Sequence, residues 1–186
     1  MRSRGAAGRR PEAGRIPGSA WAAAILSRSP GRIIPSMNYE LFMGEALAEA
    51  RLAGSRGAPA VGAIAVLHEA MVARGSNRVS EANDPTAHAV IAALREAARR
   101  LGTPRLSDIT IFTTLEPCAM CVGALLDCDA AALVYAAPNP VDGAAGTVIQ
   151  LAQHPGLGRR LEVVSGICRV EAEELVGDLE RVPSGA

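Results

Sequence analysis

The sequence has few aromatic residues and no long apolar segment. Only 3% of its 186 residues are Phe, Trp or Tyr, so the core must be built mainly from Ala, Val, Leu and Ile. No apolar run approaches the roughly 18 residues that a membrane-spanning helix requires, and we expect no membrane partner. With 49% hydrophobic and 20% charged residues, the composition predicts a soluble globular protein with one core.

Lysine is absent, and the arginines are unevenly distributed. Seven of the nineteen Arg lie before residue 37, where only Glu12 opposes them. Residues 37–186 carry 12 Arg against 18 acidic residues, a net charge of −6. An acidic body is not typical of a protein whose main task is binding phosphates.

The first 36 residues differ from the rest in composition. They are rich in Arg, Gly, Ala, Ser and Pro and lack sustained periodicity, which favours disorder. An Arg- and Ser-rich start also resembles an organelle transit peptide. The simpler interpretation is that Met37 is the natural start and that residues 1–36 are a mis-called N-terminal extension. In each case, residues 37–186 form the expected functional domain.

Periodicity and turn signals predict alternating helices and strands after Met37. The expected helices span 41–54, 84–101, 118–126, 148–153 and 171–181. The expected strands span 61–67, 70–75, 108–115, 132–136 and 161–164. Asp84 is a good N-cap and Pro85 suits the first helical position. This alternation predicts an α/β sandwich around a mixed sheet, with an antiparallel hairpin followed by parallel strand–helix–strand units.

A histidine and a Cys-x-x-Cys pair form a candidate metal site. His88 precedes Cys118 by thirty positions, and Cys121 completes the pair. Zinc prefers Cys sulfur and His nitrogen, and catalytic sites use three protein ligands and leave the fourth position for water. Both groups fall in first turns of expected helices, where the helix N-terminus stabilises thiolates. We therefore expect one zinc per chain, although three core residues without a metal remain the alternative.

All four cysteines are compatible with a reducing environment. Two belong to the Cys-x-x-Cys pair, and no export signal is evident. This pattern favours metal binding over a disulfide framework and predicts a cytoplasmic protein.

Several segments carry a family resemblance. They lie at 61–64, at Asn77, at 84–89 (DPTAHA), at 93–95 and at 114–124 (TLEPCAMCVGA). They resemble the cytidine deaminase-like superfamily, most closely the bacterial tRNA adenosine deaminases. The resemblance implies a three-layer α/β/α sandwich with a mixed five-stranded sheet, zinc, and hydrolytic loss of ammonia from an adenine- or cytosine-type base. It also implies substrate contacts from Asn77 and from the backbone around Pro117, and a homodimer.

The sequence departs from this family at the proton carrier. The family places a glutamate two residues after the histidine, where this chain has Val90. No catalytic residue is therefore secure, and Glu116 and Glu81 are weak candidates for a substitute carboxylate. The last predicted helix is acidic, whereas the family's is usually basic, which weakens tRNA as the substrate.

Three functions stay open at this stage. The first is an active deaminase of tRNA adenosine, in its anticodon loop, or of a free nucleobase or nucleoside. The second is a catalytically impaired zinc-binding pseudoenzyme or accessory subunit. The third is a structural zinc site beside a vestigial pocket.

Overall fold

The computed structural model describes residues 37–177. The predicted N-terminal extension, residues 1–36, and the end of the chain from residue 178 lie outside the described residues.

The described chain is organised around one mixed sheet of five strands in the order β2-β1-β3-β4-β5. The strands are β1 (Gly62–Leu67), β2 (Ala70–Ser76), β3 (Ile109–Leu115), β4 (Ala132–Ala137) and β5 (Glu162–Ser165). β1 pairs antiparallel with β2 and β3, and the β3–β4 and β4–β5 pairs are parallel. The predicted hairpin and the predicted mixed sheet are both confirmed.

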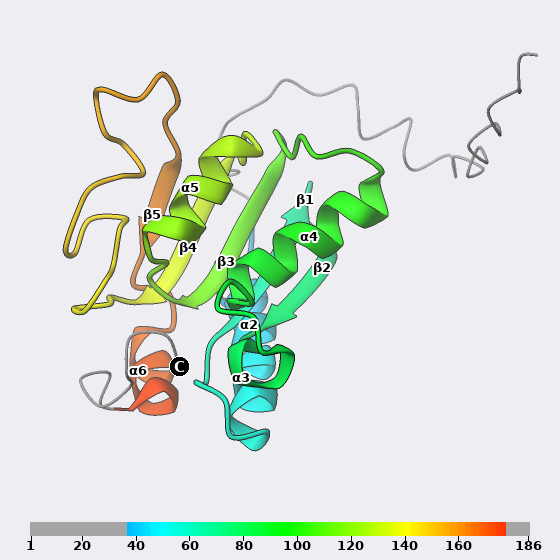
Figure 1. Ribbon diagram of the computed structural model, residues 1–186, viewed down its shortest axis with the longest axis vertical. Coiled ribbons are helices and arrows are strands. Elements are labelled where there is room, and N and C mark those ends of the chain that lie inside the picture. Colours follow the sequence, from blue (N-terminus) through cyan, green and yellow to red (C-terminus); the bar gives the residue numbers. More distant parts are fainter. Residues whose placement is uncertain (1–36, 178–186) are drawn as a thin grey trace, which may run out of the picture.

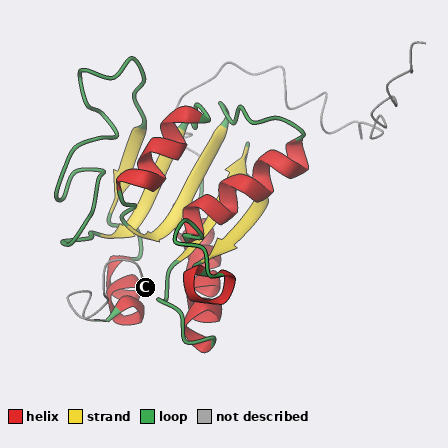
Figure 2. Cartoon of the chain, viewed as in Figure 1, coloured by secondary structure: helices red, strands yellow, loops and turns green. Residues whose placement is uncertain are grey.

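Helices cover both faces of this sheet (Figures 1 and 2). α2 (Tyr39–Ser55) and α6 (Arg169–Val176) pack on one face, and α4 (Ala89–Leu101) and α5 (Ala119–Asp127) pack on the other. A short helix, α3 (Val79–Ala82), precedes α4. This arrangement is the predicted three-layer α/β/α sandwich. Within the described residues, no helix is long and apolar enough to cross a membrane.

Alternation along the strands produces two separate apolar cores. In β1, Ala63 and Ala65 face the α4–α5 core, whereas Ile64 and Val66 face the α2 core. Both phenylalanines lie in the α2 core, where the ring centroids of Phe42 and Phe112 are 5.4 Å apart. Apart from Tyr135, the α4–α5 core is built mainly from small and aliphatic side chains, which lets both helices approach the sheet closely.

Gly75 on β2 sets the position of the first turn of α4. A Cβ atom at this position would lie 2.3 Å from the carbonyl oxygen of Ala89 and 2.5 Å from the backbone nitrogen of Ala93. Only glycine therefore allows the strand to contact this part of the helix backbone. The contact fixes the turn that carries His88 and Val90.

The predicted helix start at Asp84 is wrong, because α4 begins at Ala89. The Asp84 carboxylate accepts hydrogen bonds from the backbone N–H and the hydroxyl of Thr86, which closes a tight turn instead of capping a helix. The N–H of Arg78 then donates to the carbonyl of Ala87, and His88 is extended with φ −69° and ψ 152°. The loop therefore places His88 at the start of α4, as its N-cap.

Two further helix predictions need correction. Residues 148–153 form an irregular segment with a β-bridge at Gln150 instead of a helix, and the backbone N–H groups of Val148 and Ile149 donate to the carbonyl of Gly143. The last helix starts earlier than predicted, at Arg169, and ends at Val176 before Gly177. The predicted extension of this helix beyond residue 177 lies outside the described residues.

Candidate metal centre and active site

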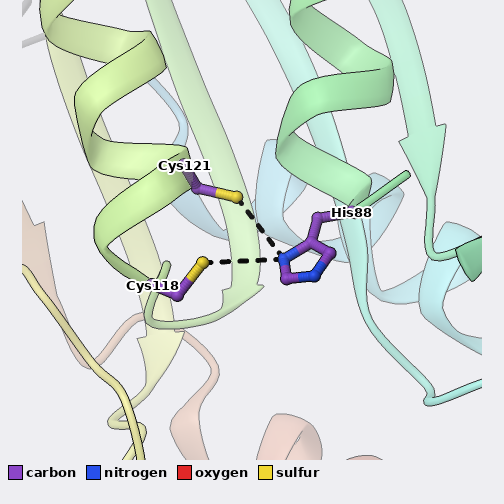
Figure 3. A group of neighbouring side chains, drawn as sticks. All are labelled: His88, Cys118 and Cys121. Atoms are coloured by element: carbon purple, nitrogen blue, oxygen red, sulfur yellow. Dashed lines mark hydrogen bonds between the residues drawn. The ribbon is translucent and has the colours of Figure 1, made fainter. Parts of the chain in front are cut away.

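The three predicted ligands meet where two helices begin (Figure 3). His88 is the N-cap of α4, and Cys118 is the N-cap of α5, with Cys121 in the first turn of α5. Neither side chain makes a capping hydrogen bond to its own helix, and both point toward a shared centre. Within residues 37–177, this is the one group of His, Cys, Asp and Glu side chains with metal-binding spacing.

The distances within this group fit tetrahedral zinc. The His88 Nδ1 atom lies 3.6 Å from the Cys118 sulfur and 3.7 Å from the Cys121 sulfur. Zinc–sulfur and zinc–nitrogen bonds of about 2.3 and 2.0–2.1 Å at a tetrahedral angle give a sulfur–nitrogen separation of about 3.6 Å. The side chains are therefore spaced as ligands of one ion. Three protein ligands leave a fourth position for water or substrate.

The protonation of the two thiols also suits a cation. Hydrogen bonds from Cys121 and His88 lower the pKa of Cys118 to about 4, against the effect of burial. The pKa of Cys121 is raised because its thiol donates to the Cys118 sulfur and because it is buried. The hydrogen bond to Cys118 raises the pKa of His88. One thiolate is thus present already, and a divalent cation would supply the attraction that ionises the second.

Val90 lies beside these ligands and is buried. It is the second residue of α4 and only 3% exposed, and it belongs to the same apolar core as Cys121 and Val122. Its side chain has no group that can accept or donate a proton. Val90, Leu94 and Ala97 lie at helical spacing on the buried face of α4, whereas Leu101 at the end of the same stripe is only partly buried.

Glu116 is a structural anchor in this arrangement. The side chain is 1% exposed, and its carboxylate accepts the backbone N–H groups of Asn139, Ala145 and Thr147 at 3.1, 2.9 and 3.0 Å. The Thr147 hydroxyl donates a fourth hydrogen bond to it. These bonds occupy both carboxylate oxygens and hold the loop after β4 against Cys118.

Glu81, the other predicted substitute, lies on the surface of α3. Its carboxylate pairs with Arg56 at 3.3 Å and with Arg78 at 3.5 Å. This side chain is 51% exposed, is paired with two arginines and lies outside the ligand group.

The two predicted substrate contacts flank the ligand group in the chain. Asn77 follows β2 and is buried, and its side-chain oxygen accepts the N–H of Val79 at 3.2 Å. Pro117 directly precedes Cys118, and its carbonyl accepts the N–H of Ala144 at 2.9 Å. The bond to Val79 orients the Asn77 amide and leaves its NH2 group as a donor for a ligand.

A further acidic residue near the ligands was not among the sequence-predicted site residues. The negative charge of Asp142 contributes to the raised pKa of both His88 and Cys121. Asp142 belongs to the loop after β4, and pairing between Cys118 and Gly143 brings that loop to the site. No periodicity or motif spacing in the sequence singles out Asp142.

Comparisons with known proteins agree with this geometry. Residues 36–137, more than half of the chain, match the family model described as the cytidine and deoxycytidylate deaminase zinc-binding region. The tRNA-specific adenosine deaminase of Agrobacterium fabrum is 39% identical, over 73% of this chain and 89% of that protein. The guanine deaminase of Bacillus subtilis is 40% identical, over 59% of this chain and 71% of that protein.

Longer relatives and solved structures extend the comparison. The chain is 45% identical to the tRNA(Ile)-lysidine synthase of Deinococcus radiodurans but spans 25% of it, and it spans 9% of the chloroplastic tRNA(adenine(34)) deaminase of Arabidopsis thaliana. A structure from studies of A-to-I editing by tRNA:A34 deaminases superposes with a TM-score of 0.71 and 39% identity, covering 73% of this chain and 98% of that chain. The fold, the ligand group and the matched region agree: the chain belongs to the cytidine deaminase-like superfamily and to its nucleoside deaminase family.

Proposed function

We propose that this protein is a zinc-dependent hydrolytic deaminase of an adenine-type base, with the wobble adenosine of a tRNA anticodon loop as its substrate. The observation that carries the proposal is the three-ligand group, whose distances suit one zinc with an open fourth position. The choice of tRNA adenosine rests on the relatives described as tRNA-specific adenosine deaminases.

His88, Cys118 and Cys121 would hold the zinc. A zinc held there would lower the pKa of a water toward about 7 and so supply a nucleophile at neutral pH. Glu116 contributes indirectly, because it anchors the loop that pairs with Cys118. Gly75 contributes by fixing the first turn of α4 against the sheet.

Asn77 and Pro117 would orient the base. The Asn77 NH2 group is suited to donate to a ring or sugar acceptor, because Val79 already holds the amide oxygen. The Pro117 carbonyl has a second lone pair beyond the one that Ala144 uses, and it is suited to accept from the substrate amine. Together they would present the carbon that bears the amine to the metal centre.

A second candidate function is a zinc-bearing binder without turnover, as a pseudoenzyme or an accessory subunit. The observation that favours it is buried Val90, which replaces the family's glutamate with a side chain that cannot carry a proton. Loss of general acid–base catalysis typically costs about 10²–10⁴-fold in rate. The binder and the enzyme share the metal site and differ only in turnover.

We also infer a cytoplasmic homodimer. Large apolar side chains are exposed near the ligand helix and the following loop: Met120, Val141, Val148 and Ile149. Pairing of two copies over such side chains would remove apolar surface from water. Light scattering of the full chain should give twice the monomer mass, and a monomeric mass at micromolar concentration would contradict the inference.

The proposed function is tested on the full chain loaded with zinc. Metal analysis should give one zinc per chain, and His88→Ala should lose it. Ammonia release is then measured with a tRNA anticodon stem–loop, adenosine, guanine and cytidine. We expect release from the stem–loop, and release from guanine alone would overturn the substrate assignment. Val90→Glu and the size-matched Val90→Gln separate the candidates, because turnover confined to Val90→Glu would establish the binder.

A further inference from the structure

Two arginines flank Asn77, the proposed substrate contact. Arg56, the C-cap of α2, donates from Nη2 to the Ser76 hydroxyl oxygen at 2.9 Å, and Ser76 directly precedes Asn77. Arg78 directly follows Asn77, and its backbone N–H donates to the carbonyl of Ala87 at 3.0 Å. Ala87 is the residue before the first metal ligand. Both arginines are therefore anchored in segments that adjoin the candidate site.

Glu81 joins the two guanidinium groups. One of its carboxylate oxygens, Oε2, lies 3.3 Å from the Arg56 Nε atom and 3.5 Å from the Arg78 Nε atom. The carboxylate thus holds both groups by the Nε edge. Within residues 37–177, the Nη1 atom of Arg56 and both terminal nitrogens of Arg78 make no hydrogen bond. The two side chains are 32% and 55% exposed, so these N–H groups are accessible to a ligand from solvent.

This Arg–Glu–Arg group carries a local surplus of positive charge. Two guanidinium groups share one carboxylate, whereas residues 37–186 as a whole have a net charge of −6. On β2, by contrast, Arg74 pairs with two carboxylates, those of Glu45 and Glu49. The Arg–Glu–Arg group therefore offers an anion a favourable position on a domain whose net charge is negative.

The chemistry of the group suits a phosphate. A guanidinium presents its N–H donors as a planar fork that matches two oxygens of a phosphate. The shared carboxylate holds the forks in place before a ligand arrives, which reduces the entropy lost on binding. A nucleotide within an RNA strand carries a phosphate on each side, whereas a free nucleobase or nucleoside carries none. The group therefore separates a base within a strand from a free base.

We propose that Arg56 and Arg78 bind a backbone phosphate of the tRNA anticodon loop, beside the nucleotide whose base is presented to the metal centre. This inference rests on the proposed function and concerns the same site. The terminal N–H groups of Arg78 and the Nη1 group of Arg56 donate to the phosphate oxygens, and Glu81 keeps its bridge between the two Nε atoms. The contact positions the strand and carries no sequence information of its own.

The test measures binding, so that it does not depend on turnover. The Kd of a fluorescently labelled anticodon stem–loop is determined for the zinc-loaded full chain at several salt concentrations. The same measurement is made for Arg56→Gln, Arg78→Gln and Glu81→Gln. The Kd values of adenosine and of adenosine 5′-monophosphate, the zinc content and the Tm are determined in parallel.

Arg99→Gln is the matched control. Arg99 and Arg100 share the Glu96 carboxylate in the last turns of α4, so this second Arg–Glu–Arg group lies at the end of the helix opposite to the metal ligands. The Arg99 side chain is 72% exposed. Its variant therefore removes the same charge from an equivalent group away from the site.

Arg78→Gln should raise the Kd of the stem–loop about tenfold, which is the loss of one charged hydrogen-bond contact. The dependence of log Kd on log salt should become shallower by about 0.7, the value for one phosphate contact to a single strand. Arg56→Gln should act in the same direction, and Arg99→Gln should bind the stem–loop like the wild type. The Kd of adenosine, the zinc content and the Tm of Arg78→Gln should stay close to the wild-type values, because exposed ion pairs contribute little to stability.

Glu81→Gln separates phosphate binding from a purely structural role of the group. Glutamine keeps an acceptor oxygen for the two Nε atoms and removes the competing negative charge. If the arginines bind phosphate, the stem–loop should bind Glu81→Gln at least as tightly as the wild type. If the group only holds the loop in place, Glu81→Gln should weaken binding together with the arginine variants, and that result would overturn the inference.

The remaining outcomes are distinct from failure of the proposed function. A wild-type Kd and salt dependence in both Arg56→Gln and Arg78→Gln overturns the phosphate contact and leaves the proposed function standing. Equal weakening in Arg99→Gln overturns it as well, because the effect would then be one of overall charge. Tight binding of adenosine 5′-monophosphate that Arg78→Gln weakens would assign the phosphate to a free nucleotide and overturn the RNA contact. Stem–loop binding that depends on Arg78 without ammonia release overturns the proposed function alone.

Discussion

Replacement of Glu116 by glutamine isolates the contribution of its charge. The substitution preserves the shape of the side chain but converts one acceptor oxygen into an NH2 donor. Glu116 Oε1 accepts the N–H groups of Ala145 and Thr147, and Oε2 accepts the N–H of Asn139 and the Thr147 hydroxyl. The better glutamine rotamer keeps its oxygen at the Oε1 site, because the Thr147 hydroxyl can rotate to accept from the new NH2 group.

The loss of stability in Glu116→Gln can be worked out from the hydrogen bonds that are kept and lost. The N–H of Asn139 would face an NH2 group, and an unsatisfied buried donor costs about 1–3 kcal/mol. The two bonds kept by Oε1 lose their charge assistance, which is about half of their strength. We therefore expect Glu116→Gln to lower the free energy of unfolding by about 2–4 kcal/mol.

Urea denaturation of the zinc-loaded full chain measures this loss. Glu173→Gln is the control, because Glu173 is an exposed partner of Arg169 on α6 and such a pair contributes about 0.3–0.5 kcal/mol. Hydrogen exchange should show faster opening of residues 139–147 in Glu116→Gln. A loss below about 0.5 kcal/mol, similar to the control, would refute the anchoring role. A variant with normal stability and zinc content but no turnover would instead make Glu116 the proton carrier.

Three further predictions concern the metal and its support. Gly75→Ala should lower the free energy of unfolding by about 1–3 kcal/mol, because its Cβ would overlap the Ala89 carbonyl. Gly44→Ala is the control, because a Cβ at Gly44 on α2 would lie in open space, and it should raise the free energy of unfolding by up to about 1 kcal/mol. Urea denaturation measures both variants, and equal changes in the two would contradict the packing argument. Zinc binding near pH 7 should release about one to two protons, since Cys121 keeps its thiol proton and the pKa of His88 is raised. Because protons are released, the affinity for zinc should rise with pH. Calorimetry in buffers of different ionisation enthalpy measures the number of protons released. Release of no protons would contradict the assignment of these residues as zinc ligands. When the free zinc concentration is a thousand times the Kd, bound zinc should add about 4 kcal/mol to the free energy of unfolding. Removal of the zinc by a chelator should therefore lower the Tm of the wild type, whereas the Tm of His88→Ala should not change on chelation.

The sequence predicted the mixed sheet from local patterns, and the structure brings His88, Cys118 and Cys121 together as candidate ligands. The three layers were expected from the family resemblance. Short apolar runs such as those of β1 and β4 specify the central strands. The Cys-x-x-Cys pair lies at the start of α5, with Cys118 as the N-cap and Cys121 in the first turn. The start of α4 was mispredicted, because a hydrogen bond between Arg78 and Ala87, nine residues apart, keeps the chain extended as far as His88. Non-local bonds of this kind leave no periodic signal.

The loop after β4 was beyond prediction for a similar reason. Residues 148–153 have apolar residues at helical spacing, but bonds from Val148 and Ile149 to Gly143 fold them into an irregular segment. The position of Asp142 depends on the bridge between Gly143 and Cys118 and on the buried Glu116 carboxylate. Neither contact is visible from spacing along the chain.

The central claim is that zinc-dependent deamination proceeds in this chain although Val90 occupies the glutamate position. The most direct measurement is single-turnover ammonia release from a tRNA anticodon stem–loop by the wild-type chain with one zinc bound. The account predicts conversion of the wobble adenosine to inosine. A wild-type chain that binds zinc and the stem–loop but releases no ammonia, beside an active Val90→Glu variant, would contradict it.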